Sequence, residues 1–186
     1  MRRFLNEIMC FTVIFLFVSV SLLNETNIDE NKNSVTLNYD VFISFHGLDT
    51  RDGFLSHLVE AFSKKKIVVF VDDKLHKGDE ISSALFQAIE TSLISLVIFS
   101  ENYASSRWCL DELVKIVQWK NKYGQILLPV FYKVQPTTVR YQKGTYANAF
   151  AEHEKNESLT MVEVEQWRSA LTESANINGY VSTNFS

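Results

Sequence analysis

The sequence predicts a single α/β domain in which helices cover both faces of a parallel sheet. Runs of apolar residues with almost no polar alternation are typical of strands buried on both faces. Four such runs occur, at residues 39–45, 67–71, 93–99 and 126–132. Segments with a helical period separate them, at the spacing of strand–helix–strand units with right-handed crossovers. Together these two observations predict a flavodoxin-like, doubly wound fold.

The helix between the second and third runs has the clearest period. Apolar residues recur there at i, i+3, i+4, i+7 and i+8, behind a helix-start signal of one glycine and two acids at 78–80. We expect the whole stripe to face the core: Ile81, Ala84, Leu85, Ala88 and Ile89.

The loops after the four runs are where function is expected, because ligands of such sheets bind beyond the carboxyl ends of the strands. After the third run comes SSRWCLDEL, residues 105–113. Ser105 or Ser106 suits the N-cap of the next helix. Trp108 and Glu112, four residues apart, then lie on one face of its first two turns, and we expect Glu112 on the helix surface. An aromatic ring beside a carboxylate can hold a flat ring and act on its substituent. The alternative is a core tryptophan and an acid that complements the helix dipole.

Composition excludes several classes of protein. With 186 residues, 46% of them hydrophobic, the chain can bury one core but is short for two domains of ordinary size. The net charge of -4 argues against nucleic acid as a partner, because such binding needs a basic face. Cys10 and Cys109 are the two cysteines, so neither a disulfide framework nor a four-cysteine zinc site can form, and we expect no metal. The sequence has no G-x-x-x-x-G-K-S/T motif, which excludes a P-loop nucleotide hydrolase.

Residues 1–38 are predicted to be separate from the domain. They begin with two arginines and an apolar run at 8–23, and a polar tether follows. This layout is typical of a signal peptide or signal anchor. The run has 16 residues, which is short for a membrane span of about 20. A cleaved signal and a membrane-associated anchor both remain open.

Six motifs resemble the plant TIR domain, in order and at the right separations. They are YDVFISFHGLDTRDGFLSHL, FVDDKLHKGDEI, AIETS, VIFSENYASSRWCLDEL, LPVFYKVQPTTVR and WRSALTESANINGY. The chain resembles the TIR module of plant TIR-type immune receptors, without the nucleotide-binding and leucine-rich-repeat regions that normally follow it. We therefore place the TIR domain at 39–180 and a short tail at 181–186.

The resemblance implies both a topology and an activity. The fold would be a five-stranded parallel sheet in the order 2-1-3-4-5. The domain would self-associate, bind other TIR-type receptors and, when assembled, cleave the nicotinamide–ribose bond of NAD+ as a signal in plant immune defence and cell death. NAD+ would be a substrate, with no permanently bound cofactor.

The resemblance also implies roles for individual residues. Glu112 matches the catalytic glutamate. Matches to the substrate-binding pocket are Phe45, His46, Gly47, Arg51, Ser106 and Trp108. Matches to self-association surfaces are Ser56 and His57 on one helix, and Asp72, Asp73, Lys74, Leu75, His76, Lys77 and Gly78 in a loop. Cys109 matches a cysteine linked in some members to nucleic-acid processing, although we interpret it as a small core residue.

Two departures from the family pattern weaken this transfer of roles. The first loop reads FHGLDTR where the family has F-R-G-E-D-T-R, so His46 replaces an arginine and Leu48 an acid. A neutral imidazole cannot replace a bidentate guanidinium at a phosphate. After NGYVSTNFS the family normally continues into a last helix. Without that helix we expect a less covered sheet, and either a less stable chain or association only through the loop surface.

Two functions are consistent with the sequence, and the localisation is a separate prediction. The first is an assembly-dependent NAD+ glycohydrolase; the alternative is a catalytically weak TIR-only adaptor or decoy that binds other TIR domains. A receiver domain is excluded, because the third strand runs into FSEN where a phospho-acceptor aspartate is needed. The charge bias around the apolar run favours a lumenal domain. An NAD+-cleaving domain with one cysteine instead suits the cytosol. We expect a cytosol-facing domain associated with an endomembrane, with a soluble cytoplasmic chain as the alternative.

Overall fold

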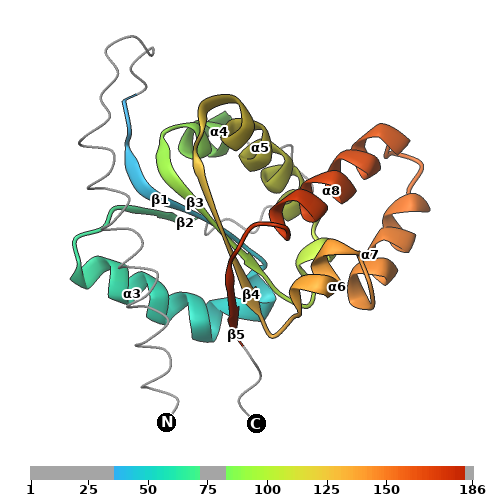
Figure 1. Ribbon diagram of the computed structural model, residues 1–186, viewed down its shortest axis with the longest axis horizontal. Coiled ribbons are helices and arrows are strands. Elements are labelled where there is room, and N and C mark those ends of the chain that lie inside the picture. The colour runs from blue at the N-terminus through green and yellow to red at the C-terminus, as the bar shows by residue number, and fades with distance from the viewer. Residues whose placement is uncertain (1–35, 72–82, 183–186) are drawn as a thin grey trace.

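A five-stranded parallel sheet forms the centre of the domain (Figure 1). The computed structural model describes residues 36–71 and 83–182, with the side chains of residues 51 and 52 outside this description. The strand order is β2-β1-β3-β4-β5, as expected. The strands are β1 (Tyr39–Phe45), β2 (Val69–Val71), β3 (Ser92–Phe99), β4 (Ile126–Tyr132) and β5 (Tyr180–Ser182).

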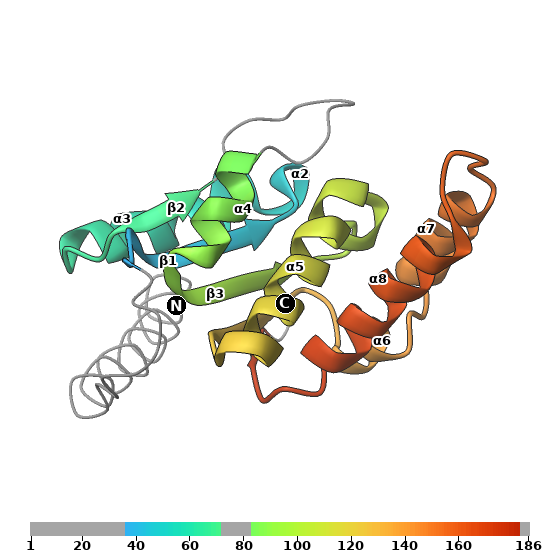
Figure 2. The same ribbon diagram turned by 90° about the horizontal axis from the view of Figure 1, so that it is seen from above.

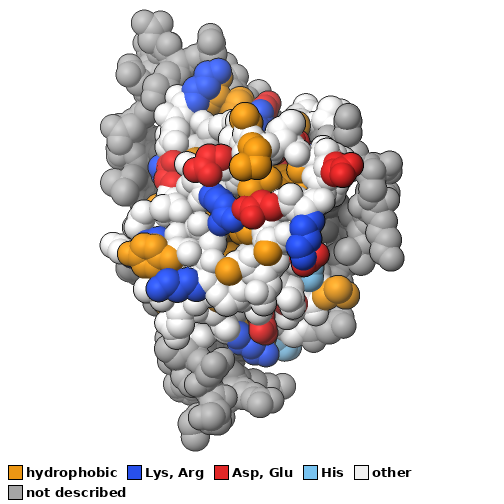
Figure 3. All heavy atoms as spheres, turned by 90° about the vertical axis from the view of Figure 1, so that its right-hand side faces the viewer, with side chains coloured by type: hydrophobic (Ala, Val, Ile, Leu, Met, Phe, Trp, Pro, Cys, Tyr) orange, Lys and Arg blue, Asp and Glu red, His pale blue; other side chains and the backbone are white. Residues whose placement is uncertain are grey.

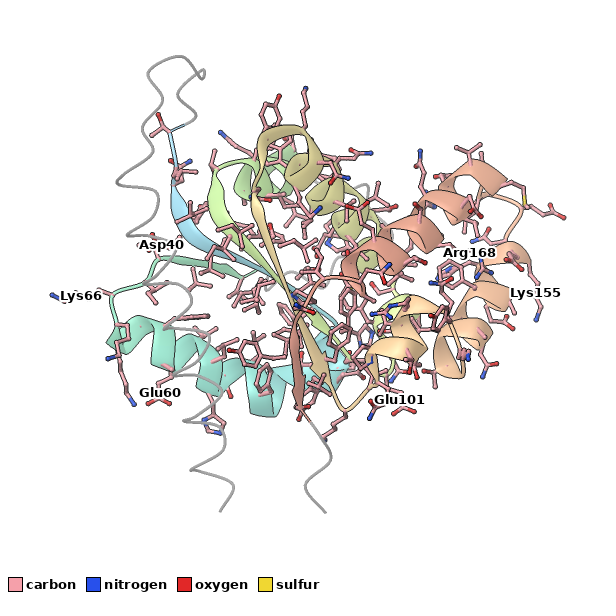
Figure 4. The ribbon with its side chains drawn as sticks, in the orientation of Figure 1. Asp40, Glu60, Lys66, Glu101, Lys155 and Arg168 are labelled. Carbon is pink, nitrogen blue, oxygen red and sulfur yellow. The ribbon has the colours of Figure 1, made fainter. Side chains whose placement is uncertain are left out.

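The predicted strands agree with the observed ones except at the start of β2 and at the first residue of β3. The run predicted from residue 67 becomes a strand only at Val69. The backbone N–H of Val68 donates to the Asp40 carboxylate at 2.7 Å instead of to a strand carbonyl, and Lys66 has a positive φ of 60°. Asp40 and Lys66 mark this end of the sheet in Figure 4. A side chain thus replaces the first ladder contact and shortens the strand.

Helices cover the two faces of the sheet (Figures 1 and 2). The helices of the first half are α2 (Gly47–Thr50), a π-helical turn η1 (Arg51–Leu55), α3 (Ser56–Lys64) and α4 (Ser83–Glu90). The second half contributes a 3-10 turn η2 (Tyr103–Ser105), α5 (Arg107–Tyr123), α6 (Pro136–Arg140), α7 (Thr145–Glu154) and α8 (Met161–Ser174). One buried cluster contains side chains of α4, α5, α7 and α8, and a second contains side chains of α3.

Alternation along β1 assigns its side chains to the two faces. Val41, Ile43 and Phe45 belong to the α3 cluster, whereas Phe42 belongs to the cluster under α4 and α5. Successive strand side chains point to opposite faces, so Ser44 shares the α5 face with Phe42. This places a polar residue of the strand under α5.

The amphipathic stripe on α4 is only partly as predicted. Leu85, Ala88 and Ile89 are buried. Ala84 is exposed, so its predicted core position is wrong; it lies in the first turn, where Ser83 is exposed as well. Ile81 lies outside the described residues.

Gly179 precedes β5 and packs closely against β4. A Cβ at this position would press on the Pro129 carbonyl oxygen and lie 2.6 Å from Pro129 Cγ. We expect Gly179→Ala to lower the free energy of unfolding by about 1–3 kcal/mol, because the backbone of β4 must shift. Urea unfolding measures this loss. Gly53→Ala is the matched control, since no described heavy atom lies within 4 Å of its Cβ. Equal losses in the two variants would show that the β4–β5 approach is not tight.

Candidate active site

Glu112 is a buried carboxyl group in the second turn of α5. Its side chain is 4% exposed, so the expectation of a helix-surface acid is wrong. Its Oε2 accepts a hydrogen bond from Ser44 Oγ at 2.6 Å. Ser44 Oγ lies 2.8 Å from Tyr103 Oη, and Tyr103 Oη donates to the Cys109 carbonyl at 3.0 Å. The carboxyl is therefore attached to β1 and to the turn before α5.

The first turn of α5 begins as the sequence indicated. Ser106 is the N-cap and accepts a hydrogen bond from Cys109 N at 3.3 Å, which decides between the two candidate serines. Trp108 is half-buried against the α5 core cluster, and its buried Nε1 has no hydrogen-bond partner among the described residues. Trp108 and Glu112 therefore occupy one face of the helix, one turn apart.

Cys109 is a core residue, as we interpreted it. It is 4% exposed, and its Sγ donates to the Phe45 carbonyl at 3.4 Å. Burial, and then the nearby Glu112 carboxyl, raise the pKa of the Cys109 thiol far above its usual value. The thiol is thus neutral and serves to join α5 to the end of β1.

Phe45 reaches the site through its backbone. Its side chain is 9% exposed and belongs to the cluster under α3, on the face opposite Glu112. Its carbonyl oxygen contacts α5 through the Cys109 thiol. The Phe45 side chain, predicted to line the substrate pocket, therefore lies on the sheet face opposite Glu112.

Asp49 connects the loop after β1 to the loop after β3. Its carboxylate accepts hydrogen bonds from Ser100 Oγ at 2.6 Å, Asn102 N at 2.9 Å and Asn102 Nδ2 at 3.0 Å. His46 Nδ1 lies 3.4 Å from the same carboxylate and has no hydrogen bond of good geometry among the described residues. His46 therefore directs one ring nitrogen at Asp49, and Gly47 beside it begins α2 half-buried.

The hydrogen bonds of Asp49 predict a pH-dependent stability. Burial raises the pKa of Asp49, but hydrogen bonds from Asn102 and Ser100 outweigh burial and leave this pKa below its usual value. The stabilisation is present above the unfolded-state pKa and is lost as pH falls through the lower folded-state pKa. We expect Asp49→Asn to lower the free energy of unfolding by about 1–3 kcal/mol at neutral pH, and by less in acid. Thermal unfolding at both pH values checks this, with the exposed Glu101→Gln as control. A loss of equal size in acid would contradict the role of the ionised carboxylate.

The remaining residues predicted to bind substrate or to mediate self-association either lie apart from Glu112 or fall outside the residues that the structure describes. Ser56 and His57 are exposed at the start of α3, and Ser56 Oγ donates to Gly53 O at 2.9 Å. The Arg51 side chain and the predicted loop surface at 72–78 lie outside the described residues. Helix α3 covers the sheet face opposite α5 (Figure 1), so the predicted α3 surface is separate from Glu112.

Sequence reasoning missed Ser44, Tyr103 and Asp49. A signal existed for each: Ser44 is a polar residue between two apolar residues of the strand, Tyr103 follows β3, and Asp49 is the one acid in FHGLDTR. Each acts through a partner far away in the sequence. Their roles therefore emerge only from the folded arrangement.

The described part of the chain offers no metal centre and no membrane helix. Within residues 36–71 and 83–182, no group of three or more His, Cys, Asp and Glu could hold a metal ion. None of the helices in these ranges is long and apolar enough to cross a bilayer. On the side of α7 and α8, acidic and basic side chains are mixed (Figure 3), so this side presents no continuous basic face.

Comparisons with known proteins agree with this architecture. The family profile described as TIR domain matches residues 38–186. The chain is 48% identical over 145 residues to disease resistance protein RPV1 of Vitis rotundifolia, covering 78% of the chain and 10% of the relative. It is 48% identical over 150 residues to TMV resistance protein N of Nicotiana glutinosa, covering 80% of the chain and 13% of the relative. The chain thus spans about a tenth of the length of these relatives.

One solved structure is similar to the chain in both fold and sequence. It contains the TIR domains of the activated Roq1 resistosome, which directly recognises the pathogen effector XopQ. The TM-score is 0.72 at 50% sequence identity, covering 80% of this chain and 90% of that one.

Proposed function

Because the chain belongs to the TIR domain family, we propose that it cleaves the nicotinamide–ribose bond of NAD+ when its domains self-associate, with Glu112 as the catalytic residue. The observation that carries the proposal is a buried carboxyl, held by Ser44, near the carboxyl ends of the strands and the start of α5. Ligands of doubly wound sheets bind at this edge. The signal would serve plant defence and cell death, in keeping with the disease resistance relatives.

A single carboxyl suits this reaction. Glycoside hydrolysis commonly needs two carboxyl groups, one of which protonates the leaving oxygen. Nicotinamide leaves as a neutral molecule from a cationic pyridinium, so no general acid is needed. An ionised glutamate beside the ribose would stabilise the positive charge that develops there, and the low-dielectric surroundings would strengthen this effect.

The other acids near the start of α5 are engaged in holding the fold. Asp49 accepts three hydrogen bonds from the loop after β3. Asp111 accepts a hydrogen bond from Trp167 on α8 at 2.7 Å and lies 3.7 Å from the Arg107 guanidinium. Glu112 is 4% exposed, and its Oε2 accepts a hydrogen bond from the Ser44 hydroxyl of the strand below it. Its place at the edge where ligands of such sheets bind favours Glu112 for the catalytic role.

Self-association is proposed through α3 and through the loop at 72–78. The exposed Ser56 and His57 support the first surface, and the likeness to TIR domains within a resistosome supports assembly. Other TIR-type immune receptors would be the heterologous partners.

The decisive experiment follows nicotinamide release and assembly in the same samples. The purified full chain is incubated with NAD+ over a range of protein concentrations, and light scattering gives the assembled fraction. Release per molecule should rise with that fraction. Release that is independent of assembly would contradict the assembly requirement.

A specific observation favours the alternative of an adaptor or decoy. In the first loop His46 stands where the family has an arginine, and its Nδ1 lies 3.4 Å from the Asp49 carboxylate. A phosphate contact from this position would be weaker than one from a permanently charged guanidinium. Under this alternative, the scattering would rise with concentration while no nicotinamide appears.

We also propose that the domain faces the cytosol while residues 8–23 associate with an endomembrane. Deleting residues 1–30 should then move the chain to the soluble fraction, since the apolar run supplies the affinity for the membrane. Asn156 reports the topology: it is exposed between α7 and α8 and heads the sequon Asn156-Glu157-Ser158. We expect no glycosidase-sensitive mobility shift, with Asn156→Gln as the matched control. A shift that Asn156→Gln abolishes would place the domain in the lumen.

A further inference from the structure

Three contacts connect four oxygen atoms beneath α5. Glu112 Oε2 lies 2.6 Å from Ser44 Oγ, Ser44 Oγ lies 2.8 Å from Tyr103 Oη, and Tyr103 Oη lies 3.0 Å from the Cys109 carbonyl oxygen. All three separations are hydrogen-bond distances. Ser44 is 1% exposed and Tyr103 is fully buried. We call this row of atoms the Glu112–Cys109 oxygen chain.

The hydrogen atoms available to this chain can be counted. Each hydroxyl contributes one hydrogen, and the Cys109 carbonyl can only accept. With an ionised Glu112, Ser44 donates to the carboxylate and Tyr103 donates to Cys109. The contact between Ser44 and Tyr103 is then left without a hydrogen, and oxygen lone pairs face each other across 2.8 Å.

A proton on Glu112 supplies the third hydrogen. Glu112 then donates to Ser44, Ser44 to Tyr103 and Tyr103 to Cys109, so every contact is satisfied in one direction. We propose that Glu112 carries a proton in the substrate-free protein at neutral pH, and that Ser44 and Tyr103 are positioning residues that fix its carboxyl group. The inference deepens the proposed function, on which its catalytic meaning rests.

The surroundings of the chain are consistent with this arrangement. Burial is the largest cause that raises the pKa of Tyr103 well above its usual range. Burial likewise raises the pKa of the Cys109 thiol, so Tyr103 and Cys109 are both neutral. Burial also raises the pKa of Tyr146 well above its usual range, so this neighbour is neutral, whereas the Asp49 carboxylate disfavours a negative charge on Cys109.

Substrate binding would reverse the preference of Glu112 for its protonated form. The pyridinium of NAD+ is a cation, and its charge favours the ionised carboxyl. The O–H bond of Glu112 then breaks and its proton passes to water, while the Ser44 hydrogen turns from Tyr103 to the carboxylate. The charge that stabilises the reaction thus appears when the substrate is present.

Infrared difference spectroscopy tests the proton directly. The full-length wild type at neutral pH should show the carbonyl-stretch band of a protonated carboxyl group, and subtracting Glu112→Gln should isolate that band. Tyr103→Phe should remove it, because Ser44 can then donate to an ionised Glu112 with no contact left unsatisfied. Tyr146→Phe is the matched control: Tyr146 is also fully buried and donates to the Ser100 carbonyl at 2.9 Å, outside the Glu112–Cys109 oxygen chain.

The outcomes separate this inference from the proposed function. Absence of the wild-type band, or its persistence in Tyr103→Phe, overturns the inference, and the wild-type spectrum decides the first point even if Tyr103→Phe does not fold. A band without nicotinamide release keeps the inference and rejects the catalytic function. Where release occurs, the acid limb of its pH profile should shift to lower pH in Tyr103→Phe and stay in place in Tyr146→Phe. If the acid limb of the pH profile does not move in Tyr103→Phe, Tyr103 is not a positioning residue.

Discussion

Glu112→Gln should lower the rate of nicotinamide release about a hundred- to a thousand-fold, the range expected when a group that stabilises transition-state charge is removed. Glutamine keeps the shape of the side chain and can still hydrogen-bond Ser44, but it cannot become negative. Alanine is a poorer choice, because Glu112 is buried and its removal leaves a cavity and an unsatisfied Ser44 hydroxyl.

The measurement is the initial rate at matched assembled fractions, with thermal unfolding to confirm the fold. Glu165→Gln is the control, since Glu165 is an exposed acid on α8 and should keep the wild-type rate. Retention of activity in Glu112→Gln would remove Glu112 from the catalytic role.

Trp167→Ala should cause the largest loss of stability, about 3–5 kcal/mol. Trp167 is 1% exposed in the centre of α8, and its indole packs in the cluster shared with α5. Its Nε1 donates to Asp111 Oδ1 at 2.7 Å, which attaches α8 to the first turns of α5. In Figures 1 and 2, α8 lies beside α5.

Trp167→Phe separates the ring from the hydrogen bond. Burial raises the pKa of Asp111, while the Trp167 hydrogen bond and the Arg107 charge oppose that rise. Phenylalanine keeps most of the apolar contact but removes the donor, so its loss should be smaller than that of alanine. Urea unfolding measures both variants, with the half-buried Trp119→Ala as a control. A loss in Trp167→Ala no larger than in Trp119→Ala would contradict the packing role of α8.

The strands were predictable because each one is an unbroken apolar run. β1 and β4 match the predicted ranges residue for residue, and the N-cap of α5 is one of the two serines expected. The early start predicted for β2 was wrong because the Asp40 carboxylate, 28 residues away from Val68, takes its N–H. Apolar pattern therefore predicts where strands lie, and distant side chains adjust where they begin.

The candidate site was only partly predictable, because its chemistry depends on contacts between distant segments. The position of Glu112 on α5 follows from helical spacing. Its burial does not, since that depends on Ser44, 68 residues away, and on Tyr103, which contacts Ser44 across 59 residues. The Phe45 ring lies under α3 because side chains alternate along β1. Matching motif residues to a family does not say on which face of the sheet a side chain lies, so this position was missed.

The glycohydrolase function is tested most directly by the amount of nicotinamide that the wild-type chain releases from NAD+ at a concentration where light scattering shows assembly. We expect many nicotinamide molecules per chain, released at a rate that falls when the sample is diluted below the assembly threshold. An assembled wild-type chain that releases no more nicotinamide than buffer would contradict the glycohydrolase function and favour the adaptor function.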